Sequence, residues 1–154
     1  MTQFLLGNYE EAASQFKQDV DYMENKNLKL FKATDARLWW SASLRALDRE
    51  VEAKDALDVY NDELEETRYL MQVLLRYYHG DAPLEELMQV IGDADDRDVL
   101  GNNYYGNFYL ALYLTATGEK DMAKAFLDLV CDSGNLDDKD LWRHLPSLLR
   151  ARLV

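Results

Sequence analysis

Apolar residues recur at the spacing of an α-helix along almost the whole chain, and this pattern constrains the fold more than any other feature of the sequence. Leu70, Val73, Leu74 and Tyr77 follow the i, i+3, i+4, i+7 rule that places side chains on one helical face. No stretch shows the strict alternation of a half-buried strand. The 154 residues include only 7 Gly and 2 Pro, which is low for a loop-rich or all-β chain. We therefore predict an all-α fold.

The breaks between these periodic segments are few and short, so we predict a single domain over residues 1–154. Asp35 is placed to cap the second helix, and Pro146 indicates a break within the last one. The predicted helices cover residues 8–24, 35–47, 50–60, 63–79, 83–92, 98–117, 120–132 and 138–152.

Three segments of the chain align on one internal pattern. Gly7 is followed by Ala12 and Phe16, and Gly118 by Ala123 and Leu127, at the same steps. In the middle segment, Asp48 takes the turn position and is followed by Ala53 and Leu57 at those steps. Gly80 marks a fourth turn, although Glu85 stands where a small residue is expected. A turn residue that accepts positive φ, and then a small residue, suits two antiparallel helices packed closely across a tight turn.

The run Gly-Asn-Tyr-Glu-Glu-Ala at residues 7–12 resembles the turn and second helix of a tetratricopeptide (TPR) repeat, and residues 118–130 resemble it a second time. The turn positions 7, 48, 80 and 118 depart from the regular 34-residue spacing of that family. The resemblance implies an α-solenoid of about three and a half helical hairpins with a C-terminal capping helix.

For function, the same resemblance implies a scaffold that binds a partner protein or peptide in a concave groove lined by the first helix of each pair. By register with the family, the groove residues are Leu38, Arg45, Leu70, Leu74, Tyr77, Tyr105, Phe108 and Leu112. Trp40 and Tyr109 are assigned to packing. Two interpretations of the groove aromatics stay open: they bind a partner, as aromatic and Arg side chains do in interfaces, or a short array folds them inward as core.

An alternative function is a structural or self-associating domain without peptide binding. The second helix of the first repeat begins near Asn8, and the six residues before Gly7 are too few for its stable partner helix. We therefore expect the side of helix 8–24 that carries Ala12 and Phe16 to lack cover. Either the chain is a shortened piece of a longer protein, or it associates through Phe4, Leu5, Leu6 and helix 8–24.

The formal net charge of -12 disfavours nucleic acid and anionic membranes as partners, because both need a positive surface. No apolar run approaches the length needed for membrane insertion. The single cysteine, Cys131, excludes an internal disulfide and fits a soluble chain in a reducing compartment. The cytoplasm is one such compartment, and a plastid is another if a targeting segment is missing from this sequence.

No residue pattern indicates an enzyme, a cofactor or a metal. His79 and His144, the only histidines, stand at no zinc spacing from another strong ligand. The acidic residues 93–98 lack the turn Gly and distal Glu of a calcium loop. The sequence also lacks a glycine-rich phosphate loop and a nucleophile elbow.

Overall fold

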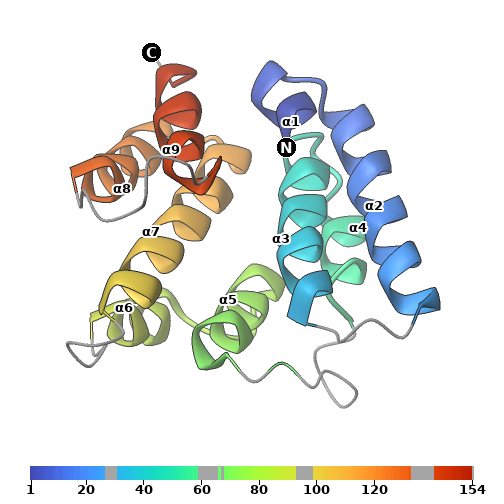
Figure 1. Ribbon diagram of the computed structural model, residues 1–154, viewed down its shortest axis with the longest axis horizontal. Helices are drawn as coiled ribbons and strands as arrows, with labels where there is room; N and C mark the ends of the chain where they lie inside the picture. The colour runs from blue at the N-terminus through green and yellow to red at the C-terminus, as the bar shows by residue number, and fades with distance from the viewer. Residues whose placement is uncertain (27–30, 59–65, 67, 93–98, 133–140, 154) are drawn as a thin grey trace.

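The computed structural model describes residues 1–26, 31–58, 66, 68–92, 99–132 and 141–153. Every regular element among these residues is a helix, which confirms the predicted all-α class. Figure 1 shows an arch, with α1 to α4 on one side, α6 to α9 on the other, and α5 between the two sides. The helices are α1 (Thr2–Leu6), α2 (Tyr9–Asn25), α3 (Phe31–Arg45), α4 (Glu50–Asp55), α5 (Tyr69–His79), α6 (Leu84–Gly92), α7 (Val99–Ala116), α8 (Lys120–Asp132) and α9 (Leu141–Ala151).

Four turns between successive helices share one geometry. Gly7, Asp48, Gly80 and Gly118 have φ angles of 86, 59, 101 and 84°, and no other described residue has a positive φ. After each of them, the next N–H donates to the carbonyl five residues earlier, at 2.9, 3.0, 2.8 and 2.8 Å. This bond ends a helix at a left-handed residue. The four positions are the ones that the sequence predicted as turns, and Asp48 adopts the conformation despite its Cβ.

The predicted small residues after three of these turns lie where helices approach most closely. Ala12, Ala53 and Ala123 expose at most 1% of their surface. Ala12 on α2 and Ala53 on α4 lie on helices that both pack on α3, and Ala123 lies on α8, which packs on α7. A larger side chain at these places would hold the helix axes apart.

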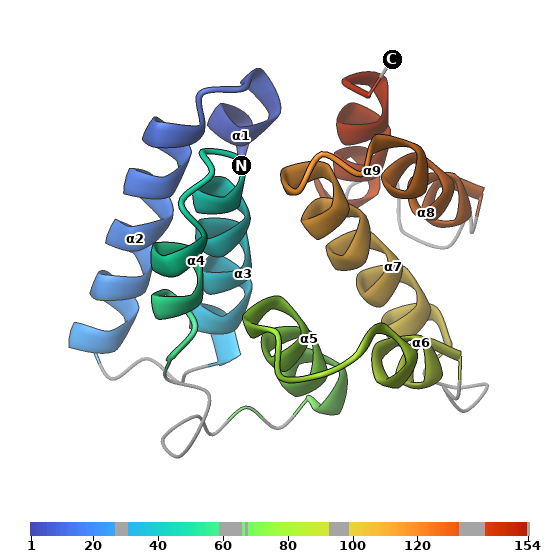
Figure 2. The ribbon, with the colours of Figure 1, turned by 180° about the vertical axis from the view of Figure 1, so that it is seen from behind.

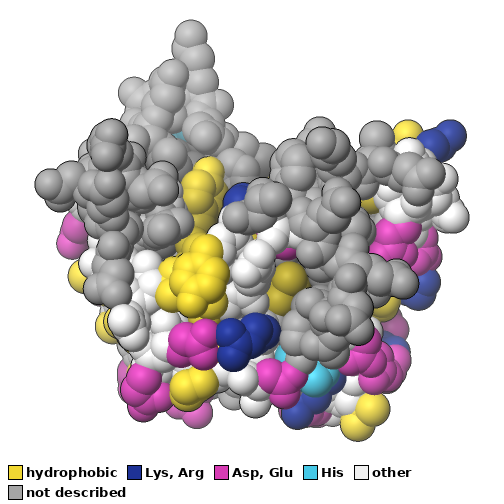
Figure 3. Space-filling view, turned by 90° about the horizontal axis from the view of Figure 1, so that it is seen from below, with side chains coloured by type: hydrophobic (Ala, Val, Ile, Leu, Met, Phe, Trp, Pro, Cys, Tyr) yellow, Lys and Arg dark blue, Asp and Glu magenta, His cyan; other side chains and the backbone are white. Residues whose placement is uncertain are grey.

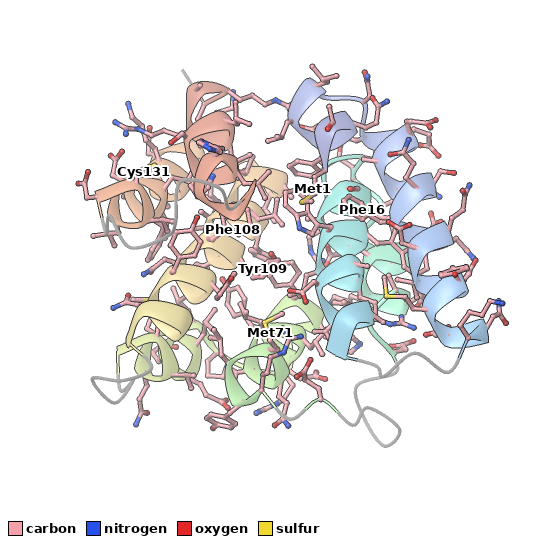
Figure 4. The ribbon with its side chains drawn as sticks, in the orientation of Figure 1. Met1, Phe16, Met71, Phe108, Tyr109 and Cys131 are labelled. Atoms are coloured by element: carbon pink, nitrogen blue, oxygen red, sulfur yellow. The ribbon has the colours of Figure 1, made fainter. Side chains whose placement is uncertain are left out.

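The core lies at the centre of the arch, where aromatic side chains of α2, α3 and α7 meet. Trp39 of α3 stacks on Phe16 of α2, with ring centroids 5.6 Å apart, and its ring also lies 5.9 Å from that of Phe108 on α7. Figure 4 shows Phe108 and Tyr109 on the side of α7 that faces α3. These contacts join the two sides of the arch through a single apolar interior.

The expectation that the N-terminal segment leaves α2 uncovered is wrong. Residues 2–6 form the short helix α1, and Phe4 is fully buried against Tyr9 and Trp39, at 5.1 and 5.3 Å between ring centroids. Ala12 and Phe16 are also buried. Of the two leucines that follow Phe4 in this segment, Leu5 is half-buried and Leu6 is exposed. Tertiary contacts therefore stabilise a helix that is too short to form in isolation.

Three further predictions about helix ends differ from the structure. Asp35 does not cap α3, which starts at Phe31; its carboxylate instead accepts a hydrogen bond from the Tyr109 hydroxyl. Helix α5 starts at Tyr69 rather than near residue 63, because residues 66 and 68 are not helical. Helix α9 continues through Pro146, since buried Leu145 and Leu149 hold both of its turns against the core. The predicted helix ends at residues 60, 63, 98 and 138 lie outside the described residues.

Candidate binding site between α2 and α4

Six of the eight predicted groove residues are buried in the core of the chain. The inner faces of α3, α5 and α7 pack on one another, so their side chains fill the space that the prediction left to a partner. Contacts of these residues with a partner remain a prediction, which would require the core to open. Leu38, Arg45, Leu70, Leu74, Phe108 and Leu112 are buried, and Tyr77 and Tyr105 are half-buried.

Arg45, the charged member of this set, joins three helices from inside. Its guanidinium donates to the hydroxyl of Ser41 and to the backbone carbonyl of Tyr78. It also lies 5.0 Å from the ring centroid of Tyr113, within the range of a cation–π contact. Glu50, at 3.1 Å from Nε, supplies the counter-charge. Because both Nη atoms donate within the chain and Glu50 balances the charge, we assign Arg45 a structural role.

A second buried polar cluster ties α7 to the segment before α5. The Tyr109 hydroxyl donates to Asp35 at 2.6 Å, and Arg68 lies 3.3 Å from the same carboxylate. Arg68 also donates to Glu66 at 2.8 Å, and Thr34 donates to Glu66 at 2.8 Å. Burial raises the pKa of Glu66, but hydrogen bonds from Arg68 and Thr34 outweigh it and leave that pKa below its ordinary value. Burial, reinforced by the Asp35 charge, raises the pKa of Tyr109 well above 10.

An accessible cleft lies on the outer side of the arch, where α2, α3 and α4 run side by side (Figures 1 and 2). It has a volume of about 460 Å³. Its apolar lining comes from Ala13, Trp40, Leu44 and Ala56, and its polar and charged lining from Glu10, Ser14, Lys17, Arg49, Glu52 and Asp55. A second hollow of about 610 Å³ at the α1–α2 turn shares Glu10 and Ser14 with it.

Trp40 gives this cleft its main apolar surface. The ring is half-buried and packs on both the central core and the smaller cluster of Ala13, Leu44 and Ala53. Lys17 of α2 places its ammonium 5.7 Å from the ring centroid. A half-exposed Trp held rigidly by the core is the kind of side chain that anchors protein interfaces.

The basic side chains of the cleft are already paired with carboxylates of the same chain. Arg49 lies 3.0 Å from Glu10, and its Nε donates to Glu52 at 2.7 Å. The hydrogen bond from Arg49 lowers the pKa of Glu52, and the same bond raises the pKa of Arg49. Lys17 pairs with Asp21 at 2.7 Å. Asp55 has no ion-pair or hydrogen-bond partner among the described residues, so it is the carboxylate most available to a ligand.

The rest of the visible surface offers no comparable combination of features. Exposed large apolar side chains are scattered, and they include Leu6 on α1, Val51 on α4 and Tyr69 on α5. Figure 3 shows the underside of the arch, where hydrophobic side chains lie among acidic and basic ones. Scattered exposed apolar residues are normal for a protein surface.

Sequence reasoning did not find this cleft. Trp40 was assigned to packing, and Lys17, Arg49 and Asp55 were not identified as site residues. One signal was present in the sequence: residues 9–25 and 49–58 hold nine acidic and three basic residues, a net charge of about -6. Two acidic helices separated by a Trp-bearing helix indicate a charged surface with an apolar base.

No family model, no curated protein and no solved structure matches this chain. Within the residues that the structure describes, no group of three or more His, Cys, Asp or Glu side chains is arranged to hold a metal ion. Among the same residues, the helices are all too short or too polar to span a bilayer. The acidic run at residues 93–98 lies outside them.

Proposed function

We propose that this chain is a TPR-like array of helical hairpins that binds a segment of a partner protein in the cleft between α2 and α4. The observation that carries the proposal is the half-exposed Trp40 at the base of a charged cleft. Interface hot spots combine such an aromatic anchor with a polar rim that excludes water. The chain thus has a rigid binding surface that does not depend on opening its core.

The four turns support the TPR-like part of the proposal. Left-handed residues at positions 7, 48, 80 and 118 each end a helix with the same hydrogen bond, and the two helices joined by each turn pack on each other. Their unequal spacing, and the packing of the inner faces on one another, distinguish this chain from a regular open solenoid. For this reason we place the partner on the outer cleft rather than in the concave groove.

Site-specific photocrosslinking in the organism that produces the protein tests the proposal. A photoreactive residue at Ser14, which is exposed and lines the cleft, should form an adduct with a defined protein. The same probe at Lys124, exposed on α8, should not. Glu52→Trp should abolish the Ser14 adduct by filling the cleft, whereas Asp121→Trp on α8 should leave it unchanged. Equal adducts from both probes, or insensitivity to Glu52→Trp, would contradict a binding role for this cleft.

A further inference from the structure

The chemistry of the partner follows from the charge around the cleft. The segments 9–25 and 49–58, which include α2 and α4, carry a net charge of about -6, half of the -12 of the whole chain. They hold only 27 of the 154 residues. Two of their carboxylates, Glu24 and Glu50, pair with Arg37 and Arg45 of α3, which leaves an acidic surplus of about -4. A local concentration of one sign steers partners of the opposite sign and repels those of the same sign.

The two basic residues of the cleft do not offset this charge for an incoming ligand. Arg49 lies between the carboxylates of Glu10 and Glu52, and Lys17 is paired with Asp21. Pairing leaves an acidic surplus, and Asp55 has no partner of its own within the described chain. An anionic peptide, nucleic acid or anionic lipid would have to displace these pairs and would meet repulsion from the rest of the surface.

Trp40 already shows how a cation is held in this cleft. The Lys17 ammonium lies 5.7 Å from the centroid of the Trp40 ring, where the negative face of the π-system attracts positive charge. Lys17 is an exposed side chain whose partner Asp21 lies one turn along the same helix. An exposed cation–π contact at this distance is weak, so a ligand cation can replace Lys17 on the ring while Lys17 stays paired with Asp21.

We infer that the occupant of the cleft is a lysine- or arginine-rich segment of a partner protein, with one of its cations on the face of Trp40 and another beside Asp55. This inference rests on the proposed function. Long basic side chains suit the site because their methylene stems pack on apolar surface while their charged ends reach carboxylates. Ala13, Leu44 and Ala56 supply that apolar surface.

The test uses the full-length chain, labelled with ¹⁵N, and three synthetic peptides of equal length, monitored by nuclear magnetic resonance. One peptide alternates Lys and Arg with Leu, the second replaces every cation with Glu, and the third replaces every cation with Gln. We expect the basic peptide to shift the indole N–H signal of Trp40 and the amide signals of Ala13 and Ser14. The acidic peptide should bind much more weakly or not at all.

Matched charge changes separate a specific cleft from general attraction to an acidic protein. Asp55→Asn should weaken binding of the basic peptide about twofold to fivefold, as loss of one exposed ion pair does. Asp121→Asn, the same change on α8 at the far side of the molecule (Figure 1), should not. Lys17→Met should strengthen binding because it vacates the Trp40 ring, whereas Lys124→Met on α8 should have little effect.

The outcomes distinguish this inference from the proposed function beneath it. Equal effects of the cleft and α8 variants would overturn the inference, because binding would then follow net charge alone. Tighter binding of the Gln or Glu peptide at the same Trp40 signals would also overturn it, but would leave the cleft as a binding site. If no peptide shifts the cleft signals and Ser14 forms no adduct in cells, both proposals are wrong.

Discussion

Gly106 offers a quantitative test of how closely α6 packs on α7. It lies within α7 (Val99–Ala116), where a Cβ atom would stand 2.5 Å from Ile91 Cγ1, 3.0 Å from Ile91 Cδ1 and 3.3 Å from Leu70 Cδ1. Ordinary contacts between carbon atoms lie at about 3.5–4.0 Å. Both neighbours are buried, so neither can turn toward solvent. An Ala at this position therefore overpacks the junction of α5, α6 and α7.

The magnitude follows from two opposing effects. Overpacking a well-packed interior costs about 1–3 kcal/mol, and replacing Gly with Ala inside a helix contributes about 1 kcal/mol of stability. We expect the net effect of Gly106→Ala to be a destabilisation of about 0–2 kcal/mol. Gly101→Ala, in the same helix with no atom within 4 Å of the added Cβ, should stabilise it by up to about 1 kcal/mol.

Thermal and urea unfolding followed by circular dichroism measure both variants. For a chain of this length, about 1 kcal/mol corresponds to a Tm change of roughly 2–4 °C. Adding Ile91→Ala to Gly106→Ala removes the atoms that clash. The loss of stability in the double variant should therefore be smaller than the sum of the two separate losses, by at least about 1 kcal/mol. If Gly106→Ala is as stable as Gly101→Ala, the close packing of α6 on α7 is wrong.

Three other predictions concern ionisable groups. The pKa of Glu66 lies below its ordinary 4.5 in the folded chain, so the ionised carboxylate stabilises the fold above pH 4.5 and this stabilisation is lost as the pH falls below 4.5. The urea midpoint of Glu66→Gln should therefore fall less on acidification than the midpoint of the parent chain. Parallel midpoint curves for the two proteins would contradict this prediction. Burial raises the pKa values of Tyr78 and Tyr109 well above 10 in the folded chain, so the unfolded chain loses these protons first and stability falls as the pH rises above 10. The absorbance of these two tyrosinates should appear only as the helices unfold. Arg152→Ala should lower the free energy of unfolding by about 1–2 kcal/mol and speed amide hydrogen exchange in α1. The reason is that Arg152 donates to the backbone carbonyl of Phe4 in this helix and, at 2.8 Å, to the Tyr9 hydroxyl. Arg150→Ala, which removes an exposed ion pair, should cost less than about 1 kcal/mol.

The sequence predicted the features that depend on neighbouring residues. Helical periodicity identified every helix except α1, and the aligned positions identified all four left-handed turns. Ala12, Ala53 and Ala123 were predicted as close-packing sites and are buried. Such features follow from local backbone preferences and from the face on which a side chain lies, and both can be read over a few residues.

Features that depend on distant parts of the chain were missed. Helix α1 is stabilised by Trp39 and by Arg152, which lies 148 positions beyond Phe4. Asp35 was predicted as a helix cap from its local sequence. Its actual hydrogen-bond partner, Tyr109, lies 74 residues away and could not be inferred from that sequence. Residues 66 and 68 are not helical, and Glu66 reaches inward to Thr34, 32 residues away. No local pattern predicts these contacts.

The candidate site was missed for a different reason. Family register placed the aromatic residues of α5 and α7 around a groove, but it could not show that the two sides of the arch meet. Trp39 and Phe108 close that space at 5.9 Å, and the burial of such large rings provides much of the stability of a small core. The residue left half-exposed is Trp40, one position from Trp39 and on another face of α3.

The acidic surface gives the proposed function a thermodynamic signature in salt. Like charges on α2 and α4 repel one another in the free protein, and a basic partner would relieve that repulsion as it binds. Added salt screens exposed charges, with a screening length of about 10 Å at 0.1 M. Raising the salt concentration should therefore increase the Tm of the free chain while weakening its affinity for a basic segment. Asp55→Asn should reduce both salt effects more than Asp121→Asn does, because Asp55 faces the acidic cleft. If stability and affinity change in the same direction with salt, the charge of the cleft does not determine its partner.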